Sequence, residues 1–490
     1  MKKLILIYLL GISTLLMGQV GIGTSTPHAS SVLELSSTSK GFIPPRMTAV
    51  QRDNIASPAQ GMVIYCTDCG ARGQLQVYDG VEYSDITGGE RLFTARSQMG
   101  DDIDGEAYGD QFGKSVALSS DGTIVAIGGD YNDNNGAGEA GHVRVFEYSS
   151  GTWLQLGNDI DGEAAGDNSG IDVALSDDGT IVAIGAYAND GNGTDAGHVR
   201  VYEYSNGSWS QLGNDIDGEA AGDYSGYAIS LSSDGNKLAI SGIGNDENGT
   251  DAGHVRVYEY SNGAWVKLGG DIEGEAAGDY SGIAISLSSD GQIVAISSPY
   301  NDGNGTDAGH VRVYEYSNGS WSQLGNDIDG EAAGDYSGIA ISLSSDGTIL
   351  AIGAIYNNGN GASAGHVRVY ENTSGNWVKI GSDIDGEASN DNFGMSVQLS
   401  GDGTMLAVGA GKNDENGSNA GHVRIFKYIN GVWGPVGADI DGEAGGDEFG
   451  YSIHLSRDGT TLSVGAPYND GNGSNSGHVR VFDNLTTTGL

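Results

Sequence analysis

The sequence predicts an all-β protein whose main part is a seven-bladed β-propeller with four-stranded blades. First, the string Gly-His-Val-Arg recurs seven times at a constant spacing of 56 residues, which is typical of a repeat architecture. Second, each repeat contains four short apolar runs, and Asp-Gly or Asn-Gly pairs between them are typical of β-hairpins. Third, repeated four-stranded units are typical of blades arranged around an axis. The repeated histidines are His142, His198, His254, His310, His366, His422 and His478.

The second repeat shows the four expected strands clearly. They cover residues 170–175, 180–184, 198–204 and 208–212. The first strand carries small residues in several repeats, as in 284–287, which suits the crowded position next to the axis. In this up-and-down arrangement the two short hairpin turns lie on one face of the disc. The two long connections lie on the other face, and because they are rich in Asp and Glu, we expect that face to be strongly negative.

The fourth strand is missing after the last repeat. Residues 96–104 align with residues 209–217 of a complete repeat, so we expect residues 91–100 to supply the missing strand and to close the ring. Closure would hide two sheet edges that otherwise promote aggregation. The propeller is therefore expected to span residues 91–490. The fourth strands that are present carry all the tryptophans of the chain, again 56 residues apart: Trp153, Trp209, Trp265, Trp321, Trp377 and Trp433.

The N-terminus predicts export. Residues 1–18 have two lysines followed by an apolar run too short to span a bilayer, which is typical of a signal peptide. Gln19 stands where a lipoprotein would carry cysteine, so we expect no lipid anchor, and no later segment is apolar for long enough to cross a membrane. Residues 19–90 are expected to form a small β-rich module, with strands near 61–65 and 74–78. We expect a secreted or cell-surface protein.

The only two cysteines, Cys66 and Cys69, form a single Cys-x-x-Cys. In an oxidising compartment we expect a local disulfide. A zinc site would need about four ligands, and no second pair of cysteines exists to supply them.

Composition limits the classes of partner. The chain has 65 acidic residues against 22 Lys and Arg, a formal charge of −43, which disfavours binding to nucleic acid or to anionic membrane surfaces. Glycine is abundant, at 84 residues, and its regular placement among Val, Ile and Tyr indicates turns rather than disorder.

The repeat resembles the FG-GAP repeat of integrin-α-type propellers. Phe449-Gly450 and Gly465-Ala466-Pro467 match both halves of that name, and the resemblance implies a seven-bladed propeller. In that family the first hairpin often carries a calcium loop, but here it is shortened to Ser-Ser-Asp-Gly at residues 232–235, which puts this calcium site in doubt. Residues 21–27, 40–47 and 61–66 resemble a leader module of secreted bacterial surface proteins, with similarity to tail-fibre-type proteins.

Calcium is the candidate cofactor, and two loop patterns are candidates for its site: the long connection that follows each fourth strand, and residues 190–195, where oxygen ligands alternate with glycine. Residues 159–167 place carboxylates at offsets of 0, 2, 4 and 8, similar to the first part of a calcium loop. Solvated turns are the alternative explanation, since no closing bidentate Glu follows. The candidate ligands are Asp159, Asp161, Glu163, Asp167, Asp215, Asp217, Glu219, Asp223, Asp327, Asp329, Glu331 and Asp335.

The repeated histidines do not predict a shared metal site, because equivalent strands of neighbouring blades lie about 10 Å or more apart. We expect His and Arg to pair with Asp or carbonyl groups between blades, and the tryptophans to pack at the rim, with sugar stacking as the alternative. His454 lies outside the repeat register, and the sequence does not explain it.

No catalytic arrangement is visible, because near-identical repeats do not bring unlike groups to one point, and the sequence has no Walker loop or His-Glu-x-x-His motif. We therefore expect no enzyme. The predicted function is an exported, non-catalytic binding or adhesion scaffold, with calcium as a candidate stabiliser. Its acidic long-loop face would bind a surface protein or a glycan. The alternative is a multivalent carbohydrate-binding lectin propeller.

Overall fold

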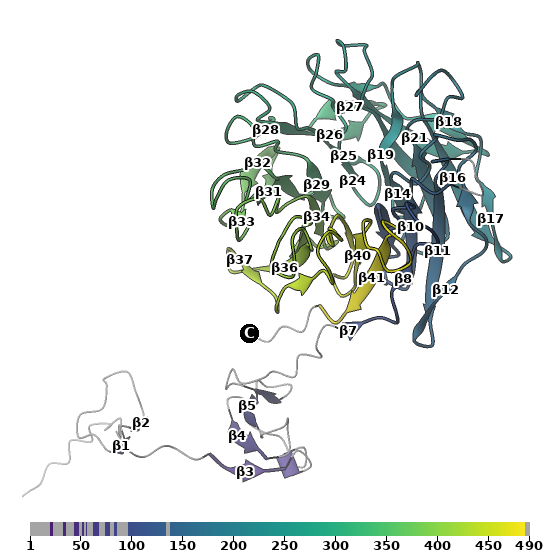
Figure 1. Cartoon of the computed structure of the whole chain (residues 1–490). Helices are drawn as coiled ribbons and strands as arrows, with labels where there is room; N and C mark the ends of the chain where they lie inside the picture. The colour runs from purple at the N-terminus through teal and green to yellow at the C-terminus, as the bar shows by residue number, and fades with distance from the viewer. Residues whose placement is uncertain are drawn as a thin grey trace, which may run out of the picture. The chain divides into compact units, whose positions relative to one another are not determined.

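A computed structural model describes two separate units of the chain (Figure 1). The first covers Met1–Phe93 and the last two residues, and the second covers Thr94–Thr488. The described residues are 20–22, 33–35, 44–48, 51–52, 55, 62–67, 74–78, 83–85, 97–133 and 138–485. The predicted signal peptide at residues 1–18 lies outside them. In the described part of the chain, no helix is long and apolar enough to cross a membrane.

The N-terminal unit contains two small sheets. β1 (Val20–Ile22) pairs in parallel with β2 (Leu33–Leu35). A four-stranded sheet follows in the order β3 (Arg46–Met47), β4 (Val63–Cys66), β5 (Gln74–Tyr78) and β6 (Tyr83–Asp85). The structure thus contains strands at the two predicted positions. Cys66 is buried and disulfide-bonded, while Cys69, the only other cysteine of the chain, lies outside the described residues.

The second unit consists of repeated antiparallel sheets, seven of them among the described residues, which we number 1 to 7 along the chain. The innermost strands are β9 (Ser115–Leu118), β14 (Val173–Leu175), β19 (Ser225–Leu231), β24 (Ile285–Leu287), β29 (Ala340–Leu343), β34 (Ser396–Leu399) and β39 (Ser452–Leu455). The second strands are β10 (Ile124–Gly129), β15 (Ile181–Ala186), β20 (Lys237–Gly242), β25 (Ile293–Ser298), β30 (Ile349–Ala354), β35 (Met405–Ala410) and β40 (Leu462–Ala466).

The third strands begin at the repeated histidines. They are β11 (His142–Ser149), β16 (His198–Ser205), β21 (His254–Ser261), β26 (His310–Ser317), β31 (His366–Thr373), β36 (His422–Ile429) and β41 (His478–Asp483). The outer strands are β12 (Thr152–Gln155), β17 (Ser208–Gln211), β22 (Ala264–Lys267), β27 (Ser320–Gln323), β32 (Asn376–Lys379), β37 (Val432–Pro435) and, in sheet 7, β7 (Ser97–Gln98).

Each sheet has a fifth, two-residue strand that the sequence did not predict. In sheet 2 the outer strand leaves the ladder after Gln211, turns at Gly213 with a φ of +84°, and pairs again with His198 and Val199. The positive φ explains why glycine stands at this turn. These strands are β13 (Ile160–Asp161), β18 (Ile216–Asp217), β23 (Ile272–Glu273), β28 (Ile328–Asp329), β33 (Ile384–Asp385), β38 (Ile440–Asp441) and β8 (Ile103–Asp104).

Sheet 7 is completed by residues from the beginning of the unit. Ser97 and Gln98 pair with Asp483 and Phe482, and β8 pairs with His478 and Val479. The prediction that residues 91–100 supply the missing outer strand is confirmed for Ser97–Gln98, whereas residues 91–96 lie outside the described part. Figure 1 shows the last strand of the unit, β41, beside β7 and β8.

Sheets 7 and 1 also contact each other through their inner strands. The Ser452 hydroxyl donates a hydrogen bond to the Gly113 carbonyl at 2.7 Å, and the Leu118 N–H donates one to His454 Nδ1 at 3.2 Å. The serines at the position of His454 in sheets 3, 4 and 5 accept the same bond from the next sheet, at 3.0, 3.0 and 2.9 Å. His454 therefore has a structural role that its position in the repeat did not reveal.

The hydrophobic core lies between successive sheets. Val199 and Val201 of sheet 2, for example, pack against Leu238 and Ile240 of sheet 3, and all four are at most 1% exposed. Because alternate residues of a strand point to opposite faces, the Val residues of His-Val-Arg-Val face the next sheet together. The fixed 56-residue period repeats this contact around the unit.

The two glycines of the FG-GAP pattern bring sheets close together. Gly450 has a φ of +90°, and its N–H donates to the Gly465 carbonyl at 3.1 Å. A Cβ added to Gly409 of sheet 6 would lie 2.1 Å from the Gly450 carbonyl oxygen of sheet 7. A side chain at position 409 would therefore push the two sheets apart.

Candidate functional site

The two long connections of each repeat lie side by side. In sheet 2 the Asn192 side-chain amide donates to the Gly218 carbonyl at 2.8 Å, and the Gly222 N–H donates to the Thr194 carbonyl at 2.9 Å. These bonds join the loop between the second and third strands to the loop that leaves the sheet. The acidic residues of both connections therefore gather at one end of each sheet.

The acid of the shortened first hairpin holds its own turn. Asp234 Oδ1 accepts bonds from the Ser232 hydroxyl at 2.7 Å and from the Asn236 N–H at 3.0 Å. These bonds lower the pKa of Asp234 and hold the turn closed, although partial burial acts in the opposite direction. The same Ser-x-Asp bond recurs in the hairpins of the other sheets, as between Ser344 and Asp346 at 2.8 Å. The repeated Asp therefore forms the turn itself.

The structure separates the four acids of each predicted calcium loop. The last acid, Asp167, is buried, and its carboxylate accepts bonds from the Asn189 amide and the Ala164 N–H, both at 3.0 Å. Asp223 accepts from the Ala220 N–H at 2.9 Å, and Asp335 accepts from Asn357 at 2.9 Å. These three carboxylates hold their own loops in shape.

The other acids face different neighbours. The first acids, Asp159, Asp215 and Asp327, each accept a bond from the glutamine four residues earlier, at 2.6, 2.5 and 2.6 Å. The second acids offer their backbone carbonyls to the Arg of the following sheet: Arg200 to Asp161 at 2.7 Å, Arg256 to Asp217 at 3.0 Å, and Arg368 to Asp329 at 2.8 Å. The third acids form ion pairs with the same Arg side chains: Glu163 at 3.6 Å, Glu219 at 3.5 Å and Glu331 at 3.6 Å.

The acids that do converge come from different loops. Glu163 of one connection and Asp215 of the next meet at the buried His198, with one ligand atom of each within 4.8 Å of the others. The same grouping surrounds His142, with Glu106 and Asp159. Burial lowers the pKa of His142 to about 4, so its imidazole is neutral at neutral pH. The groups around His142, His198, His254 and His478 each contain one histidine and two carboxylates.

The tryptophans join neighbouring sheets at the rim. Trp209 Nε1 donates to the Leu156 carbonyl of the preceding sheet at 2.8 Å, and its ring lies 5.1 Å from that of Tyr204. Trp265 and Trp321 repeat the bond at 2.9 and 2.8 Å. This arrangement supports the packing role predicted for the tryptophans.

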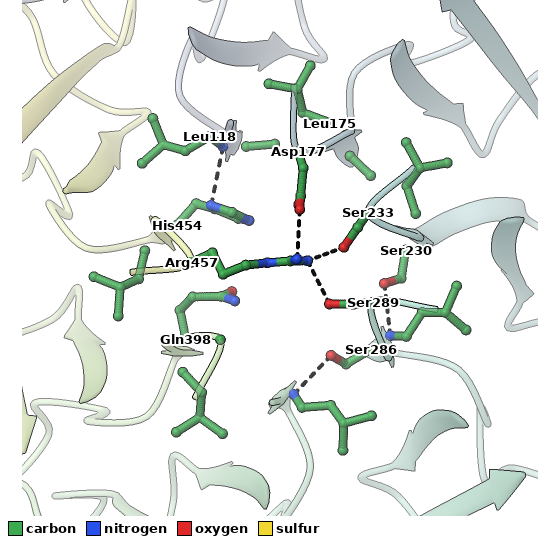
Figure 2. Close-up of a pocket in the computed structure, with 18 of the residues that line it drawn as sticks. Leu118, Leu175, Asp177, Ser230, Ser233, Ser286, Ser289, Gln398, His454 and Arg457 are labelled. Atoms are coloured by element: carbon green, nitrogen blue, oxygen red, sulfur yellow. Dashed lines mark hydrogen bonds and ion pairs between the residues drawn. The ribbon is translucent and has the colours of Figure 1, made fainter. Parts of the chain in front are cut away.

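The inner strands surround a channel of about 290 Å³ in which the repeat symmetry is broken (Figure 2). Arg457 extends across it from sheet 7, forms an ion pair with Asp177 at 2.7 Å, and donates to the hydroxyls of Ser289, at 2.6 Å, and Ser233. At this position the other described sheets carry Ser, Asp or Gly. Backbone bonds such as that from the Ser233 N–H to the Ser289 carbonyl, 3.0 Å, join neighbouring sheets at the same level.

A second cavity of about 250 Å³ lies along the inner strands next to their N-terminal ends. Lys114 Nζ lies 4.6 Å from the ring centre of Tyr451, and Asp172 and Tyr227 also line the cavity. Burial raises the pKa of Asp172 to about 7, although its carboxylate accepts bonds from the Ile229 N–H at 2.8 Å and the Val173 N–H at 3.0 Å. Sequence reasoning missed these residues. The available signal was their departure from the small and apolar residues of the other repeats.

A row of tyrosines runs through the long connections. Ring centres are 5.4 Å apart for Tyr280 and Tyr300, 5.2 Å for Tyr300 and Tyr336, and 5.1 Å for Tyr336 and Tyr356. Tyr300 and Tyr356 are 37% and 40% exposed. The row therefore presents aromatic surface among the acidic loops.

Comparison with known proteins finds the repeat family and the leader. The model of the FG-GAP repeat matches residues 383–426 and 439–482, and the model of a phage tail like trimerisation region matches residues 21–101. No curated protein matches the chain.

Three solved structures are similar in fold, all at low sequence identity. A putative 6-phosphogluconolactonase from Bacteroides uniformis has a TM-score of 0.48 and 14% identity, over 78% of this chain and 96% of that one. Hydrazine synthase from Kuenenia stuttgartiensis has a TM-score of 0.46 and 13% identity, over 78% of this chain and 96% of that one. A periplasmic gluconolactonase from Pseudomonas aeruginosa has a TM-score of 0.45 and 16% identity, over 76% of this chain and 93% of that one. The chain therefore contains two stretches that match the FG-GAP repeat and one that matches a phage tail like trimerisation region.

Proposed function

We propose that the chain is an exported, non-catalytic binding or adhesion scaffold, whose repeats form a closed seven-bladed propeller. The seven similar sheets and the bonds that join sheet 7 to sheet 1 support the ring. The FG-GAP repeats and the leader support a location at the cell surface or outside the cell. The binding surface is the acidic end of the sheets, where the long connections lie.

The observation that carries this proposal is that the charged and polar side chains along the inner strands form structural contacts. Arg457 is paired with Asp177, His454 accepts a bond from the next sheet, and both oxygens of Asp172 accept backbone bonds. These contacts hold neighbouring sheets together, which supports a structural use of these groups. The long connections, in contrast, repeat the same acidic and polar surface on each sheet.

The leader region suggests how binding is strengthened. A trimer formed through residues 21–101 would present three propellers, and multivalent attachment raises avidity without new contacts. Light scattering of the purified full chain would then give three times the 50.3 kDa chain mass. A mass of a single chain would contradict the trimer and leave the binding proposal in place.

Attachment is tested with cells that do or do not produce the full chain, on protein-coated and glycan-coated surfaces. The proposal expects attachment that depends on the chain and weakens with added salt, because the surface is acidic. Equal attachment by both kinds of cell would refute it.

A lectin is the second candidate, and the tyrosine row is the observation that favours it. Aromatic faces with nearby carboxylates and amides suit the apolar and hydroxyl surfaces of sugars. The double substitution of Tyr300 and Tyr356 by Ser would abolish glycan binding if this candidate is right. A glycan array without signal at high protein density would exclude it.

A further inference from the structure

The group around His422 contains three carboxylates, whereas the groups around His142, His198, His254 and His478 contain two. The group consists of His422, Glu387, Glu415 and Asp439, and one ligand atom of each lies within 4.8 Å of those of the other three. We call it the His422 cluster. Glu387 comes from the connection that leaves sheet 5, and the other three residues belong to sheet 6.

His422 is an unpartnered ligand within this cluster. It is 1% exposed, and neither of its ring nitrogens has a hydrogen-bond partner. A buried imidazole without a partner is costly, so a group that accepts its lone pair would stabilise the fold. Burial lowers the pKa of His422.

The charge of the cluster also favours a divalent cation. Arg424 is the only positive group paired with these acids in the described structure, at 3.3 Å from Glu387 and 3.6 Å from Asp439. Three carboxylates and one guanidinium leave a local charge of −2. The group around His198 has two carboxylates and Arg200, which leaves −1. Each carboxylate has two oxygens, so one can face Arg424 and the other a metal ion.

Glu415 owes its place to a turn that the repeats share. Its N–H donates to Asn413 Oδ1 at 2.9 Å, as the N–H at the equivalent position does in other sheets. Glycine occupies this position at Gly191, Gly303, Gly359 and Gly471. The turn therefore forms with or without the Glu415 side chain. Replacing Glu415 by glycine gives this turn position the residue that four other repeats already have.

We propose that the His422 cluster binds one divalent transition-metal ion, with Zn²⁺ as the best-suited example. Imidazole with carboxylates suits zinc, copper, iron or nickel, whereas calcium takes oxygen ligands only. The site differs from the predicted calcium loops, because its carboxylates come from three different connections and its ligands include a ring nitrogen.

The chain offers a matched control in sheet 3. Glu247 stands at the position equivalent to Glu415, but it faces Glu273. Burial, with the neighbouring Glu247 as the next contribution, raises the pKa of Glu273 to about 7. Glu247 is thus engaged by a carboxyl partner, and the group at His254 contains only Glu219 and Asp271 as acids.

The test is titration of the metal-free full chain with Zn²⁺ by calorimetry, and with Co²⁺ by visible absorption. The wild type should bind one equivalent tightly, and Glu415→Gly should weaken this binding by about tenfold or more. Glu247→Gly should bind as the wild type does. Because Glu415 is exposed, its variant should melt at the wild-type temperature without metal, which shows that the fold is intact.

Three results would overturn the proposal. They are no tight Zn²⁺ equivalent in the wild type, tight binding that Glu415→Gly leaves unchanged, or equal losses in Glu415→Gly and Glu247→Gly. Tighter binding of Ca²⁺ than of Zn²⁺ would also overturn it, because calcium would not use the His422 nitrogen.

Discussion

In several sheets, one of two facing positions on the inner and second strands carries serine where the next sheet approaches closely. In sheet 6 the hydroxyl comes from the inner strand: Ser396 donates to the Gly450 carbonyl at 2.8 Å, and Gly409 stands opposite. In sheet 3 the serine is on the second strand: Ser241 accepts a bond from the Ala228 N–H of its own inner strand at 2.9 Å. Sheet 4 repeats the second arrangement. None of the sheets described has serine at both positions.

Because serine never occupies both positions in the described sheets, we expect Gly409→Ser to destabilise the protein strongly. The new Cβ would lie 2.1 Å from the Gly450 oxygen and 2.3 Å from the Ser396 hydroxyl, so the sheets must separate by about an ångström. Overpacking of this kind costs about 1–3 kcal/mol, and loss of the Ser396 bond adds about 1 kcal/mol. We expect a destabilisation of about 2–4 kcal/mol. The unit Thr94–Thr488 has an unfolding entropy of about 0.8 kcal/mol per kelvin, so the melting temperature should fall by about 2–5 °C.

The assay is a double-mutant cycle by thermal melting of the full chain. The pair Ser396→Ala and Gly409→Ser recreates the arrangement of sheet 3, so it should recover about 1 kcal/mol or more of the loss. Ser396→Ala alone should cost about 1 kcal/mol. A single Gly409→Ser variant that melts within one degree of the wild type, or a double variant no more stable than that single variant, would refute the reasoning.

Three further predictions follow from the contacts between sheets and from the loops. Burial lowers the pKa of His454 to about 4, below its unfolded value of 6.5, so its contribution is present above pH 6.5 and is lost as the pH falls through 4. His454→Gln should therefore reduce the loss of unfolding free energy on acidification by up to about 3 kcal/mol, measured by melting at several pH values, and an unchanged pH profile would contradict this. Trp209→Phe removes the 2.8 Å bond to the Leu156 carbonyl and should lower the free energy of unfolding in denaturant by about 1 kcal/mol. An unchanged free energy would show that this bond contributes no net stability. If calcium binds at the predicted loop acids, the protein should melt at a higher temperature in calcium than in chelator. Equal melting temperatures would mean that these acids form only hydrogen bonds and Arg ion pairs.

Much of the fold could be predicted because each strand is encoded locally. Alternating Val residues at 199 and 201, and turn pairs such as Asn206-Gly207, specify strands and hairpins without knowledge of their neighbours. The extra two-residue strand was missed because it depends on how the chain returns to His198 after the turn at Gly213.

The candidate site was predicted less well, because its residues meet across sheets. The spacing of Asp159, Asp161, Glu163 and Asp167 suggested ligands of one ion, yet the structure directs them to different partners. The channel residues were missed for a related reason. The role of Arg457 cannot be predicted from its own repeat, because its partners Asp177, Ser233 and Ser289 lie in three other sheets.

The amino-acid sequence alone determined the repeat length, the strands, and the need for a segment before the first repeat to complete the last sheet. These properties depend on residues that are near in sequence or in fixed register. Only the tertiary structure decided which carboxylates face His422, and which side chains cross the channel. Packing of one sheet on the next sets those distances, and a difference of a few ångströms separates an ion pair, a metal ligand and a solvated acid.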